Sequence, residues 1–368
     1  MSRALRPASG GGKALGTALA LVALVGVPAS RASAQAPRET RARQLLERYL
    51  EDQHVPGASA AISRNGRIVW SAGFGMANLE LRVPATPETR FRVGSISKAL
   101  TSVAVAQLWD GGRLDLDVPV QRYVPSFPEK AHPITTRQLG GHLSGLPHYN
   151  REDIVNRVHY ESVTHALDKF KDRPLLFTPG ERFSYSSFGW NLISAVVEGA
   201  AGVPFLDYME RRVFEPLGMT RTGPDRYEAV IPDRTAFYVV HPDGKTENGP
   251  AVDNSDVWAG GGFLSTAEDL TRFGEGVQGG AVVSQRGRQL LFTRMTTTAG
   301  DSTGYGLGWR VRDLDGRRVV GHGGSHVGAT AQLLLDPTNR VVVAILTNSN
   351  NRGLSDLADD LARLFAER

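Results

Sequence analysis

The chain has 368 residues, of which 41% are hydrophobic and 22% are charged, a composition typical of a folded globular protein and not of a disordered one. It contains no cysteine, which excludes disulfides, thiolate metal sites and lipid attachment through cysteine. The formal net charge is +4, but residues 1–34 hold four of the 42 basic residues and no acidic residue, which leaves 38 basic against 38 acidic residues. This balance gives no electrostatic support for a nucleic-acid partner.

The N-terminal segment predicts a secretory signal peptide. Arg3, Arg6 and Lys13 precede an apolar run over residues 14–27, and small residues follow as far as Ala34. The apolar run is shorter than the about 20 residues that a membrane-spanning helix needs. We expect cleavage near Ala34, a periplasmic or secreted protein over residues 35–368, and no stable membrane span; an uncleaved anchor is the alternative.

The first predicted elements after this segment are a helix and a hairpin. Apolar residues recur at helical spacing over residues 39–53. Two strands, over residues 58–63 and 67–74, flank Asn65-Gly66, a dipeptide that favours a type I′ turn. The sequence therefore predicts an antiparallel strand pair near the N-terminal end.

The pattern Ser95-Ile96-Ser97-Lys98 stands at the start of a mostly apolar helix over residues 99–109, which Gly111-Gly112 ends. Residues three apart on a helix share a face, so the Ser95 hydroxyl can meet the Lys98 amine. At the helix N-terminus unpaired N–H groups favour a developing oxyanion. Ser95 is thus a candidate nucleophile and Lys98 its base, provided that burial or positive charge lowers the lysine pKa. The alternative is a capping serine with a surface lysine.

The middle of the chain predicts helices and the C-terminal part predicts strands. Helical patterns cover residues 188–200 and 205–214, and a further helix starts at the capping-box pattern Ser265-x-x-Glu268. Strands are predicted over residues 307–311, 317–321, 329–335 and 341–347, before an amphipathic helix over 354–365. We expect an α+β fold in which strands from both chain ends (about 56–75 and 305–348) form one antiparallel sheet, with flanking helices and a mainly helical insertion.

Two further segments supply candidate site residues. Tyr185 lies in a polar loop just before an apolar helix, which would direct its phenol into a cleft; it can act as a base beside a cation such as Lys98, or it is a packing residue. His322 lies in a glycine-rich strand where a ligand can approach main-chain N–H groups, and it can donate to a substrate; a glycine-rich bend is the alternative. His142 and His148 have no acidic partner pattern, so we expect neither a metal nor a cofactor.

Ser95-x-x-Lys98, Tyr185-Ser186-Ser187 and His322-Gly323-Gly324 occur in an order that resembles the penicillin-recognising serine hydrolases. That β-lactamase/transpeptidase-like family includes class C β-lactamases, D-alanyl-D-alanine carboxypeptidases, esterases and the mitochondrial serine β-lactamase-like protease. The likeness covers roughly residues 40–365. Connecting phrases also match, among them 91–94, 134–139, 142–147, 177–180 and 305–309.

The resemblance implies that Ser95 is acylated and that Lys98 and Tyr185 share the proton transfers. It also implies that the backbone N–H groups of Ser95 and Ser325 form an oxyanion hole. Ser187 stands where the family's Tyr-x-Asn motif has asparagine, and His322 stands where many β-lactamases have lysine. Both departures look closer to the esterase and peptidase branches and to the mitochondrial-type protein.

These residues lead us to expect a serine peptidase or esterase that acts on a peptide, a D-amino-acid amide or an ester. A genuine β-lactamase and a non-catalytic sensor of the penicillin-binding type are the alternatives, and a purely structural cell-envelope protein is disfavoured. Ser187, His322, Gly323, Gly324 and Ser325 are the expected substrate-binding and oxyanion residues. The sequence does not specify the substrate or the oligomeric state.

Overall fold

The computed structural model describes residues 32–366, so nearly all of the predicted signal peptide lies outside the described residues. The twelve strands of the described residues are β1 (Gly57–Arg64), β2 (Arg67–Asn78), β3 (Val83–Pro84), β4 (Phe91–Arg92), β5 (Gly223–Pro224), β6 (Tyr238–Val240), β7 (Thr246–Asn248), β8 (Phe263–Ser265), β9 (Arg310–Leu314), β10 (Arg317–His326), β11 (Ala329–Asp336) and β12 (Val341–Thr347).

The α-helices are α1 (Ala32–Asp52), α2 (Ile96–Asp110), α3 (Thr136–Gly140), α4 (Arg151–Ile154), α5 (Ser187–Ala201), α6 (Phe205–Met209), α7 (Trp258–Gly261), α8 (Ala267–Gly279), α9 (Gln285–Phe292) and α10 (Leu354–Ala366). Short 3₁₀ turns cover Val120–Arg122, His165–Lys169 and Glu215–Leu217, and a π-helical turn covers Glu210–Phe214. No single helix among these is long and apolar enough to cross a membrane; only the pair Ser187–Ala201 and Phe205–Leu217, bent by 78°, meets the length and composition criteria together.

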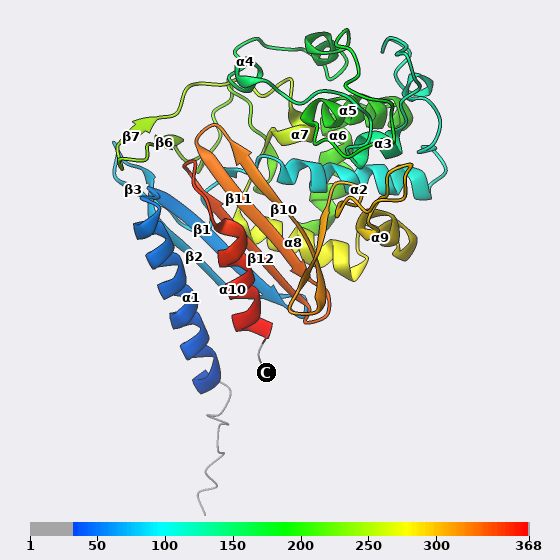
Figure 1. The fold of residues 1–368 in the computed structure, drawn as a ribbon. Coiled ribbons are helices and arrows are strands. Elements are labelled where there is room, and N and C mark those ends of the chain that lie inside the picture. Colours follow the sequence, from blue (N-terminus) through cyan, green and yellow to red (C-terminus); the bar gives the residue numbers. More distant parts are fainter. Residues whose placement is uncertain (1–31, 367–368) are drawn as a thin grey trace, which may run out of the picture.

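A seven-stranded antiparallel sheet joins the two ends of the chain, in the order β3-β2-β1-β12-β11-β10-β9. The N-terminal strand β1 pairs along its length with the last strand, β12. Helices α1 and α10 lie on one face of this sheet, and α8 and the helical part lie on the other (Figure 1). The predicted α+β fold, with a sheet from both ends and a helical insertion, is therefore confirmed.

The element boundaries differ from the prediction at several places. The first helix begins at Ala32 instead of residue 39, and β9 starts three residues later than predicted. The predicted helix over 205–214 is α6 followed by the π-helical turn. The helix after β8 is capped by Thr266, whose side chain accepts from the Asp269 N–H, so the predicted capping residue was off by one position.

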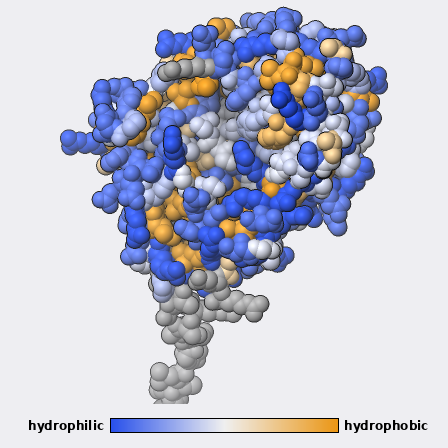
Figure 2. All heavy atoms as spheres, in the orientation of Figure 1, coloured by the Kyte–Doolittle hydropathy of each residue, from blue (hydrophilic) through white to orange (hydrophobic). Residues whose placement is uncertain are grey.

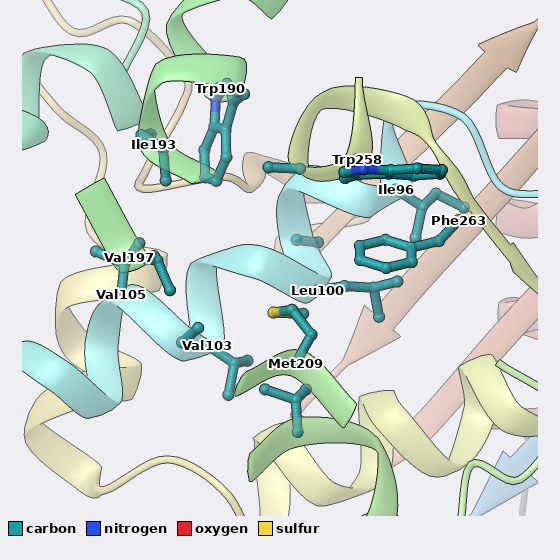
Figure 3. Close-up of a cluster of buried hydrophobic side chains, with 14 of the residues drawn as sticks. Ile96, Leu100, Val103, Val105, Trp190, Ile193, Val197, Met209, Trp258 and Phe263 are labelled. Atoms are coloured by element: carbon teal, nitrogen blue, oxygen red, sulfur yellow. The ribbon is translucent and has the colours of Figure 1, made fainter. Parts of the chain in front are cut away.

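The hydrophobic core has two parts, separated by the sheet. The smaller part lies between the sheet and helices α1 and α10. The larger part surrounds α2, which is buried on nearly every side. Figure 3 shows Ile96, Leu100 and Val103 of α2 among side chains from α5, α6, α7 and β8, so α2 is a fixed central element. On the face in Figure 2, hydrophobic residues are scattered among hydrophilic ones.

Candidate active site

The site is built around the first turn of α2. Ser95 is the N-cap residue of this helix, yet its hydroxyl makes no capping hydrogen bond and remains accessible to a pocket. Lys98, one turn later, is 0% exposed, and its Nζ donates to Ser95 Oγ at 3.0 Å and to the Gly260 carbonyl at 2.6 Å. The alternative of a capping serine with a surface lysine is thus contradicted by the geometry.

Lys98 has no acidic partner among the residues that the structure describes. Burial lowers the lysine pKa well below its ordinary value, because the charged form loses its hydration. Once it is neutral, the amine has a lone pair within 3.0 Å of Ser95 Oγ and can accept the hydroxyl proton. The pair therefore has the geometry and the electrostatics of a nucleophile and its base.

Tyr185 completes this group. Its ring lies on the loop before α5, with Lys98 Nζ at 5.0 Å from the ring centroid. Burial raises the phenol pKa to about 12, and a side-chain hydrogen bond with Ser95 opposes that shift. The phenol is therefore protonated at neutral pH, so in this resting structure it is suited to donate a proton and not to accept one. Burial drives Lys98 towards its neutral form, so a base role for Tyr185 beside a charged Lys98 stays a prediction.

The strand β10 approaches the nucleophile through glycine contacts. A Cβ on Gly94 would lie 2.7 Å from the Ser325 nitrogen, and a Cβ on Gly324 would lie 2.0 Å from the Val93 carbonyl oxygen. Gly94 also has φ +49, a conformation that favours glycine. The main chains of Ser95 and Ser325, the predicted oxyanion residues, are therefore in adjacent segments held in contact.

A buried ion pair between Arg92 and Asp225 also helps to hold β10 close to the segment that carries Ser95. The Arg92 guanidinium donates to Asp225 at 2.7 Å and to the Val327 carbonyl at 2.9 Å. Arg92 is the last residue of β4, three positions before Ser95, and Val327 follows β10. One side chain thus links the segment that carries the nucleophile to the hairpin that carries Ser325.

His322 lies differently from the other predicted residues. It is 2% exposed; its Nδ1 lies 2.6 Å from the Gly323 carbonyl and its Nε2 lies 2.7 Å from the Tyr305 hydroxyl. Since the carbonyl can only accept, Nδ1 carries the proton and Nε2 accepts from Tyr305. Burial lowers the His322 pKa to about 3, with a further contribution from Lys98, so the ring is neutral. In this structure neither nitrogen is free for a substrate, and donation by His322 stays a prediction that requires one of these bonds to open.

A pocket of about 660 Å³ opens over this group. It is lined by Ser95, Tyr185, Ser187 and Ser325 of the predicted residues, whereas His322, Gly323 and Gly324 are not part of its lining. The charged side chains in its lining are Asp153, Asp253 and Asp256, and neither lysine nor arginine lines it within the described residues. Each of these carboxylates contacts a cationic or imidazole partner: Arg173, His159 and Lys169, respectively. A second cavity of about 600 Å³, beside Trp109 and Arg286, contains none of the predicted catalytic residues.

Sequence reasoning missed several residues that hold the site. Gly260 supplies the carbonyl that accepts from Lys98, and the run Gly260-Gly261-Gly262 was an available signal for close backbone approach. Tyr305 holds His322, and Asn191 accepts from the Tyr149 hydroxyl at 3.0 Å. Among the described residues, His142 and His148 included, there is no group of three or more His, Cys, Asp or Glu side chains that could hold a metal ion.

Comparison with known proteins places this geometry in a family. The family model described as Beta-lactamase matches residues 42–367. The human mitochondrial serine beta-lactamase-like protein LACTB is 33% identical, and the match covers 92% of this chain and 81% of that protein. The octameric penicillin-binding protein homologue from Pyrococcus abyssi has a TM-score of 0.78 at 27% identity over 89% of this chain and 78% of its own.

A third similar protein has a named activity. The D-stereospecific amidohydrolase from a Streptomyces species has a TM-score of 0.74 at 25% identity, over 87% of this chain and 97% of its own. The two solved structures share the fold of the present chain over 78% and 97% of their own lengths.

Proposed function

The chain belongs to the beta-lactamase family of serine hydrolases, and within this family we propose that it is a peptidase, amidase or esterase that acts through an acyl-enzyme on Ser95. The observation that carries the proposal is the 3.0 Å contact between Ser95 Oγ and the amine of Lys98, a lysine with no exposed surface. We further propose that the protein is exported and that processing occurs near Ala34.

The proton transfers follow from the two pKa directions. Neutral Lys98 takes the Ser95 proton as Oγ attacks the substrate carbonyl, and the oxyanion forms beside the amides of Ser95 and Ser325. Tyr185, protonated at rest, donates its proton to the leaving amine or alkoxide and regains one from Lys98. Water then attacks the ester carbonyl and gives a proton to neutral Lys98. As the bond between Ser95 Oγ and the acyl carbon breaks, Lys98 returns that proton to Oγ, and the acid product leaves.

The lining of the pocket supports a substrate that carries no carboxylate beside the reacting carbonyl. A β-lactam or a D-Ala-D-Ala peptide carries a carboxylate that needs a cation near the reacting carbonyl. The described lining contains no lysine or arginine, its three aspartates already have partners, and His322 is neutral and engaged by Tyr305. Efficient β-lactam hydrolysis is therefore not expected, whereas an ester or an amide without an adjacent carboxylate fits.

The test of the proposal is covalent labelling of Ser95. The wild-type protein should react with a fluorophosphonate probe and hydrolyse short-chain p-nitrophenyl esters or D-amino-acid amides. Ser95→Ala should abolish both, because the nucleophile and its base act as one unit. Ser126→Ala, at an exposed serine outside the pocket, is the matched control and should react as the wild type does. Labelling that persists in Ser95→Ala would contradict the proposal.

A substrate panel separates the alternatives. Opening of a chromogenic cephalosporin with multiple turnover would show a β-lactamase, and release of terminal D-alanine would show a carboxypeptidase. Stoichiometric acylation without turnover on esters, D-peptides and β-lactams would show a sensor.

A further inference from the structure

Residues 142–148 run alongside the loop that carries Tyr185. The carbonyl of His142 accepts from the Ser184 N–H at 2.9 Å, and its ring Nδ1 accepts from the Ser186 N–H at 3.1 Å. One residue therefore binds the chain on both sides of Tyr185. Ser186 Oγ in addition donates to the Pro147 carbonyl at 2.7 Å.

A second histidine binds the next amide. His148 Nδ1 accepts from the Ser187 N–H at 3.1 Å, an N–H in the first turn of α5 that has no partner within the helix. Together, His142 and His148 hold the two successive amides that follow Tyr185. In contrast to His142, which is fully buried, His148 is exposed and lines the pocket.

Both rings also contact the phenol ring itself. The centroid of His142 lies 4.1 Å from that of Tyr185 at an interplanar angle of 33°, and His148 meets Tyr185 edge-on at 5.5 Å and 89°. The phenol thus lies between a face contact and an edge contact, and these restrict its swing about the Cα–Cβ bond. Its oxygen must stay near Ser95 and Lys98 if it is to transfer a proton.

His142 is held in a costly conformation. Its backbone has φ +60, which costs about 1 kcal/mol for a residue with a side chain. Because Nδ1 accepts from Ser186, the proton must be on Nε2, and that buried atom has no hydrogen-bond partner. A packing role alone would be met by an apolar ring without an unpaired donor, so the imidazole at this position has a further use.

We propose that His142 and His148 are positioning residues that clamp the main chain on either side of Tyr185 and so hold its phenol against Ser95 and Lys98; this inference rests on the proposed function of that site. An imidazole suits the task because one nitrogen accepts from an amide while the ring packs on the phenol. Burial lowers the pKa of both histidines, which keeps the accepting nitrogen unprotonated.

The experiment is a double-mutant cycle with Tyr185. His148→Leu removes the acceptor, and His148→Asn keeps an acceptor at the same distance from the backbone. We expect His148→Leu to lower kcat for a p-nitrophenyl ester about 10- to 100-fold with KM within about 2-fold, since a small misplacement of a reacting group has effects of this size. His148→Asn should recover most of this loss.

The cycle separates positioning from a structural effect. In a Tyr185→Phe background the His148→Leu change should lower the residual rate by less than about 2-fold, because the group that it positions is absent. An equal loss in both backgrounds would overturn the inference. The second pair is His142→Gly, which removes the acceptor, and His142→Asn, which keeps one; glycine and asparagine both tolerate a positive φ. We expect His142→Gly to lower kcat as His148→Leu does, and His142→Asn to recover most of that loss.

Hydrogen exchange gives a readout that needs no activity. The amides of Ser186 and Ser187 should exchange faster in His142→Gly and His148→Leu, while the amides of α2 keep their protection. Unchanged exchange at Ser186 and Ser187 would overturn the clamp even if the protein had no turnover. Absence of fluorophosphonate labelling in the wild type with faster exchange in the variants would instead overturn the proposed function alone.

Discussion

Lys98 is a charged residue type that the fold buries completely in the site. A lysine side chain normally keeps its amine in water, and this one has no exposed surface and no carboxylate partner among the described residues. The fold therefore destabilises the ammonium form. That cost lowers the pKa of the lysine, so an uncharged amine is available beside Ser95 to accept its proton.

The rate should fall at acid pH and not at moderately alkaline pH. Burial lowers the pKa of Lys98, so the active neutral form is lost as the pH falls through that lowered pKa. The phenol of Tyr185 has a pKa of about 12 and stays protonated at lower pH. A plot of kcat/KM against pH should therefore show one acid limb and a plateau to about pH 11.

Lys98→Arg is the matching variant. A guanidinium keeps its charge throughout, so the rate should fall about 10²- to 10⁴-fold at every pH. An acid limb that survives unchanged in Lys98→Arg would assign that limb to a group other than Lys98.

For single residues, the sequence predicted which side chains belong to the site better than it predicted which partners hold them in place. The spacing of Ser95 and Lys98 sufficed to predict their contact, because three residues on a helix give one geometry. The roles of Gly260, Tyr305 and the two histidines could not be predicted, because each acts through a partner more than a dozen residues away in the chain. Such pairs depend on how the elements pack.

At the scale of elements, the site depends on how closely β10 approaches the start of α2. A Cβ at position 324 would lie 2.0 Å from the Val93 carbonyl oxygen, whereas one at position 323 would meet only the end of the Gln332 side chain, at 3.1 Å. Gly324→Ala must therefore push β10 and Ser325 away from Ser95. Gly323→Ala can be accommodated by a movement of Gln332.

These neighbouring glycines give a matched pair of variants. We expect Gly324→Ala to lower the free energy of unfolding by about 1–3 kcal/mol, the usual cost of an overpacked site, and to lower the acylation rate at least about 10-fold. Gly323→Ala should change both much less. Chemical denaturation and fluorophosphonate labelling rates measure the two effects; equal effects of the two substitutions would contradict the described approach of β10 to Val93.

Strands with clear turns were predicted most closely. Asn65 and Gly66 both have positive φ, as the type I′ turn requires, and β12 matches its prediction at both ends. The strand β10 runs five residues beyond its predicted end, through the glycines, because pairing with β11 outweighs their low strand propensity. Local patterns contain no information on such long-range pairing.

At the scale of the whole molecule, only one of the two parts of the hydrophobic core surrounds the site. Leu46 belongs to the smaller part, between the sheet and α1 and α10, whereas Ser95 and Lys98 lie in the larger helical part. Substitutions in the smaller part should therefore change stability without changing the chemistry.

Leu46→Ala tests this separation. Because Leu46 is fully buried, we expect the free energy of unfolding to fall by about 2–5 kcal/mol, while kcat and the labelling rate of the folded protein stay within about 2-fold. Leu79→Ala, at a residue that is 40% exposed, should cost less than about 0.5 kcal/mol. Thermal or urea unfolding measures both; a parallel loss of rate in Leu46→Ala would show that the two parts of the core are coupled.

The pairing of β1 with β12 also determines the order in which the protein can assemble. A growing polypeptide that has not yet reached Val341 exposes the backbone of β1 as an unpaired edge, open to association with other chains. Contacts between such distant positions form slowly, and this pair cannot form before residues 341–347 have been synthesised. Ribosome-stalled chains that stop before β12 should therefore be sensitive to protease and dependent on chaperones, whereas chains that expose residues 341–347 should complete the sheet.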